Sequence, residues 1–205
     1  ATGRYLNGMD TVLMSGEDIK PLKTTIRDGL SLVPAGEALQ NVEHQVQKPE
    51  LVVRRLRYAL HERLARSDLF RVLIDTPSFP GVLFHAAIDV ADELIIPVVP
   101  DYLALLSLTT MIERIRELEQ QSVRKYAIRI VICRYQEKRR LAREVREKLV
   151  AYFPGSVLQT VIRECPLFAE APSFRKTIFE YRPNCSGAED YTGLAQDMIE
   201  ERMAA

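Results

Sequence analysis

A short apolar run that ends in a carboxylate is the feature that most constrains the fold of this chain. Residues 70–74 are mostly apolar, and Asp75 follows them directly. The next six residues, 76–81, contain Pro77, Pro80 and Gly81, which discourage a strand from continuing. Short runs rich in β-branched or aromatic residues and closed by such breakers are typical of buried strands. The pattern therefore predicts a buried strand over 70–74 with Asp75 at its carboxyl end.

The position of Asp75 suggests two different roles. Open α/β sheets bind ligands at the carboxyl ends of their strands. An apolar strand followed by Asp is also the pattern of a Walker B strand, whose Asp holds Mg²⁺ in P-loop nucleotidases. The alternative is that Asp75 only caps the following helix, because this pattern is common in α/β proteins.

Composition narrows the class of protein. The 205 residues suffice for one large domain or two small ones. Lys and Arg together number 28, as do Asp and Glu, so any binding of nucleic acid would need a local basic patch. Cys133, Cys165 and Cys185 form no CxxC pair. Their scatter argues against a disulfide framework or a zinc site and favours a reducing compartment.

Apolar periodicity predicts strands that alternate with helices. Further strands are expected at 30–33, 93–100, 127–133 and 157–162, and helices at 37–46, 49–64, 82–90, 103–120, 138–152 and 187–203. This alternation predicts a mostly parallel sheet with helices on both faces. On the last helix we expect a buried face formed by Tyr191, Leu194, Ala195, Met198 and Ile199.

Three stretches match one known family. They are Val72-Leu-Ile-Asp-Thr-Pro77, then Ala91-Asp-Glu-Leu-Ile-Ile-Pro-Val98 with Asp101-Tyr-Leu-Ala-Leu105, and finally Glu170-Ala-Pro-Ser173 with Lys176, Ile178, Tyr181, Pro183, Ser186-Gly-Ala188, Tyr191, Leu194 and Ala195. Here, and from about Tyr5 to Ile199, the sequence resembles the ParA/MinD type of deviant-Walker ATPases, within it the ParA/Soj branch of partitioning proteins. The resemblance implies a P-loop NTPase-like α/β fold, as one domain over 1–205.

The resemblance also implies a function. Proteins of this kind are ATP-dependent switches for chromosome or plasmid partitioning, with ATP and Mg²⁺ as cofactors. They form a homodimer, bind nonspecific DNA, act with a centromere-binding partner of the ParB type, and are cytoplasmic and nucleoid-associated. A membrane-bound switch of the MinD type is disfavoured, because the tail 198–205 is short and acidic.

One element of the family is missing from these residues. A phosphate-binding P-loop needs G-x-x-x-x-G-K-[ST], and the nearest string, Gly3-Arg-Tyr-Leu-Asn-Gly8, lacks the Lys and the Ser or Thr. In the family this loop belongs to a first strand-loop-helix unit that precedes the matching residues. We expect an N-terminal truncation; the alternative is a degenerate homologue acting only as a partner- or DNA-binding module. The ATP site is therefore expected to be incomplete, no catalytic residue is assigned, and the 205 residues should be poorly stable or self-associate beside Val72–Ile74.

The resemblance assigns the nucleotide-site residues one by one. Asp75 would bind Mg²⁺, and Thr76 and Pro77 would form a switch that senses the γ-phosphate. Arg134 and Arg163 occupy the positions where family members approach the adenine.

A basic helix supplies the expected DNA-binding residues. Arg139, Arg143 and Arg146 are spaced by four and three residues and share one helix face. The full expected set is Lys138, Arg139, Arg140, Arg143, Arg146, Arg163 and Lys176. Clustered cations of this kind give salt-dependent affinity for phosphates that does not depend on sequence. The alternative is a solvated helix paired internally with Glu144 and Glu147.

Overall fold

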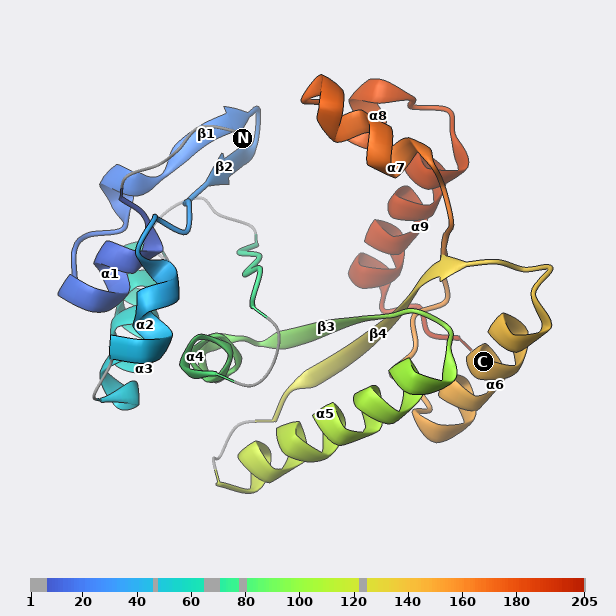
Figure 1. Cartoon of the computed structure of the whole chain (residues 1–205), viewed down its shortest axis with the longest axis horizontal. Helices are drawn as coiled ribbons and strands as arrows, with labels where there is room; N and C mark the ends of the chain where they lie inside the picture. Colours follow the sequence, from blue (N-terminus) through green and yellow to red (C-terminus); the bar gives the residue numbers. More distant parts are fainter. Residues whose placement is uncertain (1–6, 46–47, 65–70, 78–80, 122–124, 205) are drawn as a thin grey trace. The chain divides into compact units, whose positions relative to one another are not determined.

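The computed structural model describes residues 7–45, 48–64, 71–77, 81–121 and 125–204. The chain divides into two compact units, residues 1–91 and residues 92–205, here named unit 1 and unit 2. Figure 1 labels the helices and strands of both units.

Unit 1 is built from four short helices and a hairpin. Its helices are α1 (Met9–Ser15), α2 (Leu39–Gln45), α3 (Pro49–Arg57) and α4 (Val82–Val90), with a 3₁₀ turn η1 (Lys20–Leu22). Strands β1 (Thr24–Arg27) and β2 (Leu30–Leu32) form an antiparallel pair. Helix α3 continues as a π-helical segment, η2 (Tyr58–Leu64). The helices expected at 37–46, 49–64 and 82–90 are thus confirmed in type, with the π segment replacing the end of the second.

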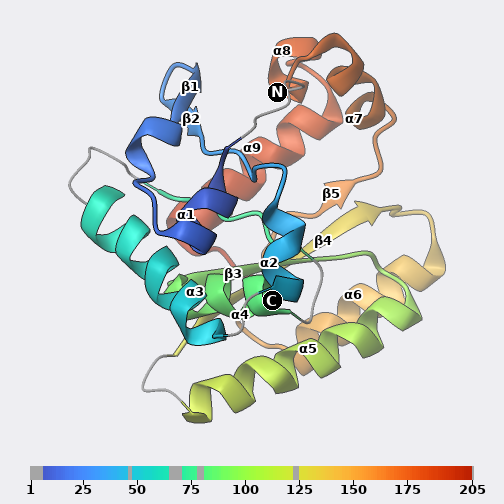
Figure 2. The ribbon, with the colours of Figure 1, turned by 60° about the vertical axis from the view of Figure 1, so that its left-hand side comes forward.

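The core of unit 1 lies between its helices. One cluster joins buried residues of all four helices, namely Leu13, Val42, Val52, Leu56, Ala86 and Val90. Figure 2 shows α1 and α3 adjoining, in agreement with their contacts. The Arg55 guanidinium, on α3, donates to the Leu13 carbonyl at 2.8 Å, which supplies a partner for the free carbonyl end of α1.

The predicted strand over 70–74 is wrong for the residues that the structure describes. Residues 71–77 have no regular secondary structure, and the side chains of Val72, Leu73 and Ile74 are 49%, 82% and 39% exposed. Residue 70 lies outside the described residues. An apolar run forms a stable strand only beside a neighbour that satisfies its N–H and C=O groups. Within the described residues no strand pairs with this segment, which explains its irregular backbone.

Unit 2 holds a parallel sheet. Its strands are β3 (Glu93–Val98), β4 (Ala127–Tyr135) and β5 (Ile162–Arg163), in the order β3-β4-β5. The register runs from Glu93 opposite Ala127 to Val98 opposite Ile132. The helical elements are α5 (Tyr102–Gln121), α6 (Arg140–Tyr152), α7 (Leu167–Glu170), η3 (Ala171–Phe174), α8 (Ile178–Tyr181) and α9 (Ser186–Glu200).

Helices cover both faces of this sheet, as predicted. In Figures 1 and 2, α5 and α6 lie on one side of the strands and α9 lies on the other. Val131, Leu158 and Ile162 form a buried cluster with Leu194 and Met198 of α9. Ile130 and Ile132 flank Val131 along β4 and are fully buried on the opposite face. The mostly parallel, P-loop NTPase-like fold class is confirmed.

Two details of unit 2 differ from the sequence prediction. The strand expected at 157–162 pairs as a strand only at its end, while Val157 bridges Ile130 and Leu158 bridges Met203. On α9 the predicted buried face is confirmed only in part, because Leu194 and Met198 pack against the core while Tyr191 and Ile199 are 42% and 65% exposed. The buried side of α9 also carries the carboxylates of Asp190 and Asp197. They accept the backbone N–H groups of Arg163 and Thr160. No helix among the described residues is long and apolar enough to span a membrane.

Candidate functional site

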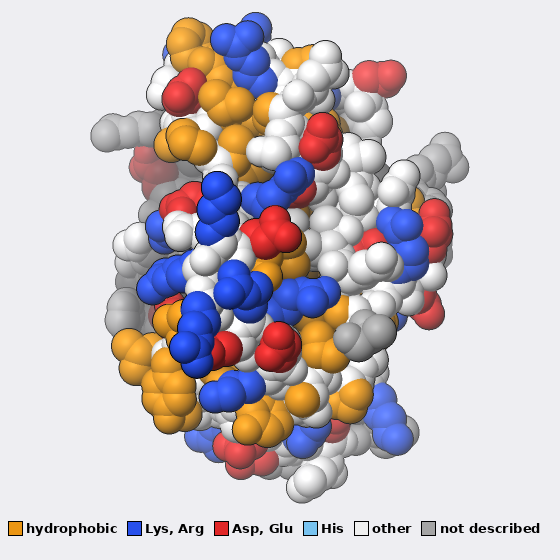
Figure 3. Space-filling view, turned by 90° about the vertical axis from the view of Figure 1, so that its right-hand side faces the viewer, with side chains coloured by type: hydrophobic (Ala, Val, Ile, Leu, Met, Phe, Trp, Pro, Cys, Tyr) orange, Lys and Arg blue, Asp and Glu red, His pale blue; other side chains and the backbone are white. Residues whose placement is uncertain are grey.

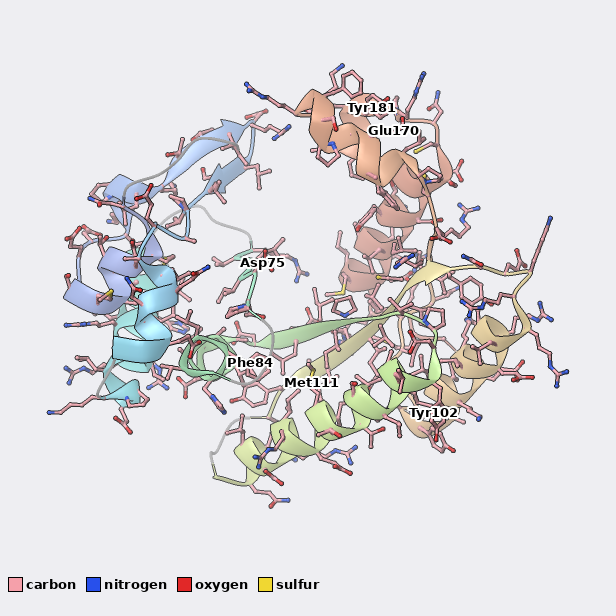
Figure 4. The ribbon with its side chains drawn as sticks, viewed as in Figure 1. Asp75, Phe84, Tyr102, Met111, Glu170 and Tyr181 are labelled. Atoms are coloured by element: carbon pink, nitrogen blue, oxygen red, sulfur yellow. The ribbon has the colours of Figure 1, made fainter. Side chains whose placement is uncertain are left out.

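Asp75 lies on the irregular segment that leads to α4 (Figure 4). Asp75, Thr76 and Pro77 are all exposed, and the Asp75 carboxylate makes no hydrogen bond to the described part of the chain. A protein-bound Mg²⁺ is typically held by one or two carboxylates together with substrate phosphates. In the described ranges no group of three or more His, Cys, Asp or Glu side chains could hold a metal ion. These residues supply one accessible carboxylate, which does not by itself make a nucleotide site.

The first turn of α4, which follows this segment, is held by a residue that the sequence analysis missed. The Glu43 carboxylate of α2 accepts the N–H of Val82 at 2.8 Å and the N–H of Leu83 at 3.0 Å. The contact joins residues 39 and 40 positions apart, so no local sequence pattern could have indicated it. It places a negative charge at the positive end of the α4 dipole.

The predicted basic residues surround the start of α6. Lys138, Arg139, Arg140 and Arg143 are exposed, and Arg146 is half-buried. The opposite side of α6 is buried through Ala142, Val145 and Leu149. Figure 3 shows Lys and Arg side chains gathered on this side of the molecule, with Asp and Glu between them. The periodicity of α6 therefore places its arginines as the sequence predicted.

Two of these cations are already engaged. Arg140 and Glu144 form an ion pair with Nε and Oε1 2.6 Å apart, and the hydrogen bond from Arg140 lowers the pKa of Glu144. The Arg143 Nη1 donates to the Glu137 carbonyl at 2.7 Å. Within the described residues, Lys138, Arg139 and Arg146 make no ion pair. Of the five cations at the start of α6, the internal ion pair thus accounts for Arg140, a backbone hydrogen bond engages Arg143, and three remain.

Arg134 and Arg163 lie at the carboxyl ends of neighbouring strands. Tyr135 is opposite Arg163 in the β4–β5 register. Arg134 has a left-handed backbone (φ 53°) and pairs with Glu164 at 3.2 Å. Hydrogen bonds from Gln136 and then Arg134 lower the pKa of the exposed Glu164 carboxyl. The structure therefore brings these two arginines to the end of the sheet where the carboxyl ends of β4 and β5 lie.

Arg163 is tied into α9. Its Nη2 lies 2.6 Å and its Nε 2.9 Å from Asp190 Oδ1, and its backbone N–H donates to Asp190 Oδ2 at 2.8 Å. A second ion pair reaches Glu189 at 3.2 Å. The hydrogen bond with the buried Asp190 raises the pKa of Arg163. The charge of Arg163, which the sequence assigned to nucleotide or DNA, is thus paired with carboxylates inside unit 2.

Lys176 lies in a segment with defined local geometry. It is exposed, and it follows Arg175, whose left-handed backbone (φ 55°) ends η3. Nearby, the Tyr181 hydroxyl donates to Glu170 at 3.0 Å, and the two side chains face one another in Figure 4.

The predicted site residues are divided between the two units. Asp75, Thr76 and Pro77 belong to unit 1, while every other predicted site residue belongs to unit 2.

Comparison with known proteins identifies the family. Residues 7–129 match the AAA domain family (AAA_31). The chromosome partitioning protein ParA of Caulobacter vibrioides is 30% identical over 172 residues, covering 83% of this chain and 64% of that protein. The chromosome-partitioning ATPase Soj of Thermus thermophilus is 30% identical over 188 residues, covering 91% of this chain and 72% of that protein. The chain belongs to the ParA/Soj family of partitioning ATPases.

Structural comparison shows the fold that this chain shares with solved proteins. A putative plasmid partition protein of Borrelia burgdorferi, solved bound to AMPPNP, has a TM-score of 0.76 at 19% identity, covering 93% of this chain and 72% of that one. At this identity the likeness shows the shared fold. The present chain spans 64% of the length of the Caulobacter relative. The resemblance deduced from the sequence is confirmed.

Proposed function

We propose that the protein is a ParA-type partitioning switch that binds nonspecific DNA through the start of α6. The observation that carries this proposal is a set of three cations without an ion pair in the described chain, Lys138, Arg139 and Arg146. Arg143 lies beside them and makes a hydrogen bond to a backbone carbonyl but no ion pair. Contacts to DNA phosphates need clustered cations and carry no sequence information. Family membership supports the proposal, because the relatives' names describe partitioning proteins.

The nucleotide part of the proposal assigns the ligands of the switch. In it, Asp75 contacts Mg²⁺ of bound ATP, Thr76 and Pro77 respond to the γ-phosphate, and Arg134 lies toward the adenine. ATP would favour a homodimer that binds nucleoid DNA in the cytoplasm and meets a ParB-type partner. The 205 residues contain no phosphate-loop motif, so by themselves they should bind ATP weakly or not at all.

A DNA-binding titration with a charge-matched control tests the α6 surface. The triple variant Arg139→Ala, Arg143→Ala, Arg146→Ala removes two positive charges from α6 and one from the residue that precedes it. The control removes three exposed positive charges elsewhere in unit 2, through Arg114→Ala, Arg116→Ala and Lys125→Ala. Fluorescence anisotropy with a random-sequence duplex should show at least about a tenfold loss of affinity for the α6 variant, since each phosphate contact contributes on the order of 0.5–1 kcal/mol. Equal losses in both variants would contradict a localised site.

Titration with ATP tests whether the nucleotide site of these 205 residues is incomplete. Titration of the chain with ATP and Mg²⁺, followed by calorimetry, should give no saturable heat. Micromolar binding that is lost on Asp75→Ala would show that the chain holds nucleotide without a recognisable phosphate loop, and would overturn the proposed incomplete site.

A further inference from the structure

The start of α4 depends on a carboxylate from another helix. The first four N–H groups of a helix have no acceptor within it, and Gly81, which precedes α4, has no side chain to serve as a cap. Glu43 accepts two of these N–H groups, from Val82 and Leu83. α2 thus supplies the cap that the local sequence lacks.

Gly81 is fitted to this contact. A Cβ at Gly81 would lie 2.6 Å from each Glu43 carboxylate oxygen, closer than side chains approach one another. The backbone of Gly81 is extended, with φ −170° and ψ 174°, so any residue could adopt it. A side chain at this position would therefore displace the Glu43 carboxylate, which is the flexible end of its side chain, from the first turn of α4.

The helix that carries Glu43, α2, is packed into the core of unit 1. Val42, next to Glu43, is fully buried and clusters with Ala86 and Val90 of α4. Glu43 consequently reaches the first turn of α4 from a helix whose position is set by the core of unit 1. A residue anchored in this way transmits the position of one helix to the start of the other.

We propose that Glu43 is a positioning residue for the segment that carries Asp75. The cap fixes the first turn of α4, which begins at Val82, five residues beyond Pro77. A movement of Thr76 and Pro77 toward a phosphate would then pull on the first turn of α4, which Glu43 links to α2. Glu43 therefore couples the switch segment, residues 75–77, to the core of unit 1. This proposal rests on the proposed function only in taking residues 75–77 as the nucleotide-sensing segment.

A double-variant cycle measured by NMR tests the coupling. In Glu43→Ala the amide protons of Val82 and Leu83 should exchange with solvent about tenfold faster, as loss of a helix cap implies. Gly81→Ala should give a similar increase, because its methyl group displaces the carboxylate. In the double variant the effect of Gly81→Ala should vanish, because nothing remains to be displaced. Glu43→Gln keeps one acceptor oxygen and should restore part of the protection, while the exposed Glu37→Ala should change nothing.

The segment itself supplies the second readout. The ¹⁵N order parameters of Asp75 and Thr76 should fall in Glu43→Ala and in Gly81→Ala, while those of Ile130 and Ile132 in unit 2 stay unchanged. Multiplicative effects in the double variant, or unchanged order parameters at Asp75 and Thr76, would overturn the proposal. An equal acceleration of exchange throughout unit 1 would also overturn it, because that is the signature of general destabilisation. The cycle is measured without nucleotide or DNA, so its outcome is independent of whether the chain binds either.

Discussion

Replacing Arg163 by Ala should destabilise unit 2 far more than removal of an exposed surface cation. The change leaves the Asp190 carboxylate, whose side chain is 8% exposed, with one backbone N–H in place of the Arg163 guanidinium. Breaking a fully buried pair by removing one partner costs about 3–5 kcal/mol. The Arg163 side chain is 45% exposed, so water can compensate in part, and we expect about 2–3 kcal/mol.

Urea unfolding followed by circular dichroism measures this cost. With a urea dependence of about 2 kcal/mol per molar, the unfolding midpoint should fall by about 1 M or more. The matched control is Arg134→Ala, which removes an exposed pair with Glu164 and should cost less than about 1 kcal/mol. Equal midpoint shifts for the two variants would refute the reasoning that Arg163 is held as a structural partner of α9. Weaker DNA binding by Arg163→Ala would then have to be judged against the stability of the variant.

Three further changes probe the structure more locally. Asp10 is buried, and its carboxylate accepts the N–H groups of Gly8, Thr11 and Ala38. Asp10→Ala should therefore lower the free energy of unfolding by about 2–4 kcal/mol in a urea titration. A cost no larger than that of the exposed Asp28→Ala would argue against these bonds. Arg55→Met keeps the aliphatic stem but loses the bond to the α1 carbonyl end, and amide exchange in α1 should accelerate about fivefold, whereas unchanged rates would show that water replaces the guanidinium. Burial raises the pKa of the Cys133 thiol, so the folded state favours the neutral form. The contribution of this thiol to stability should be constant below the ordinary thiol pKa of about 8.5 and should fall as the pH rises above it. Cys133→Ala should reduce this fall, as measured by urea midpoints at neutral and alkaline pH.

The sequence predicted the architecture of unit 2 well because periodicity reports burial directly. The alternation of β3, α5, β4 and α6 follows from apolar runs and helical spacing that each segment carries within itself. The basic face of α6 was predictable for the same reason. Its DNA contact stays a prediction, since spacing places the cations but does not name what they bind.

Features that depend on distant residues could not be predicted in this way. Val72, Leu73 and Ile74 have the composition of a strand, but a strand also needs a neighbour, and no local pattern reports one. On α9, the buried Asp197 carboxylate accepts the Thr160 N–H at 2.6 Å, across 37 residues, and lies 2.9 Å from Arg202 Nε. A pattern based on apolarity assigns such a carboxylate to the surface. Glu43 escaped notice for the same reason, since its partners are backbone groups of another helix.

The salt dependence of DNA binding shows whether the start of α6 is a phosphate-contact surface. Affinity for a random-sequence duplex is measured at several salt concentrations for the unmodified chain and for the Arg139→Ala, Arg143→Ala, Arg146→Ala variant. Each phosphate contact contributes about −0.9 to the slope of log K against log salt concentration. Three lost contacts should therefore make the slope less steep by about 2.7. Equal slopes for the two proteins would show that DNA does not bind at α6.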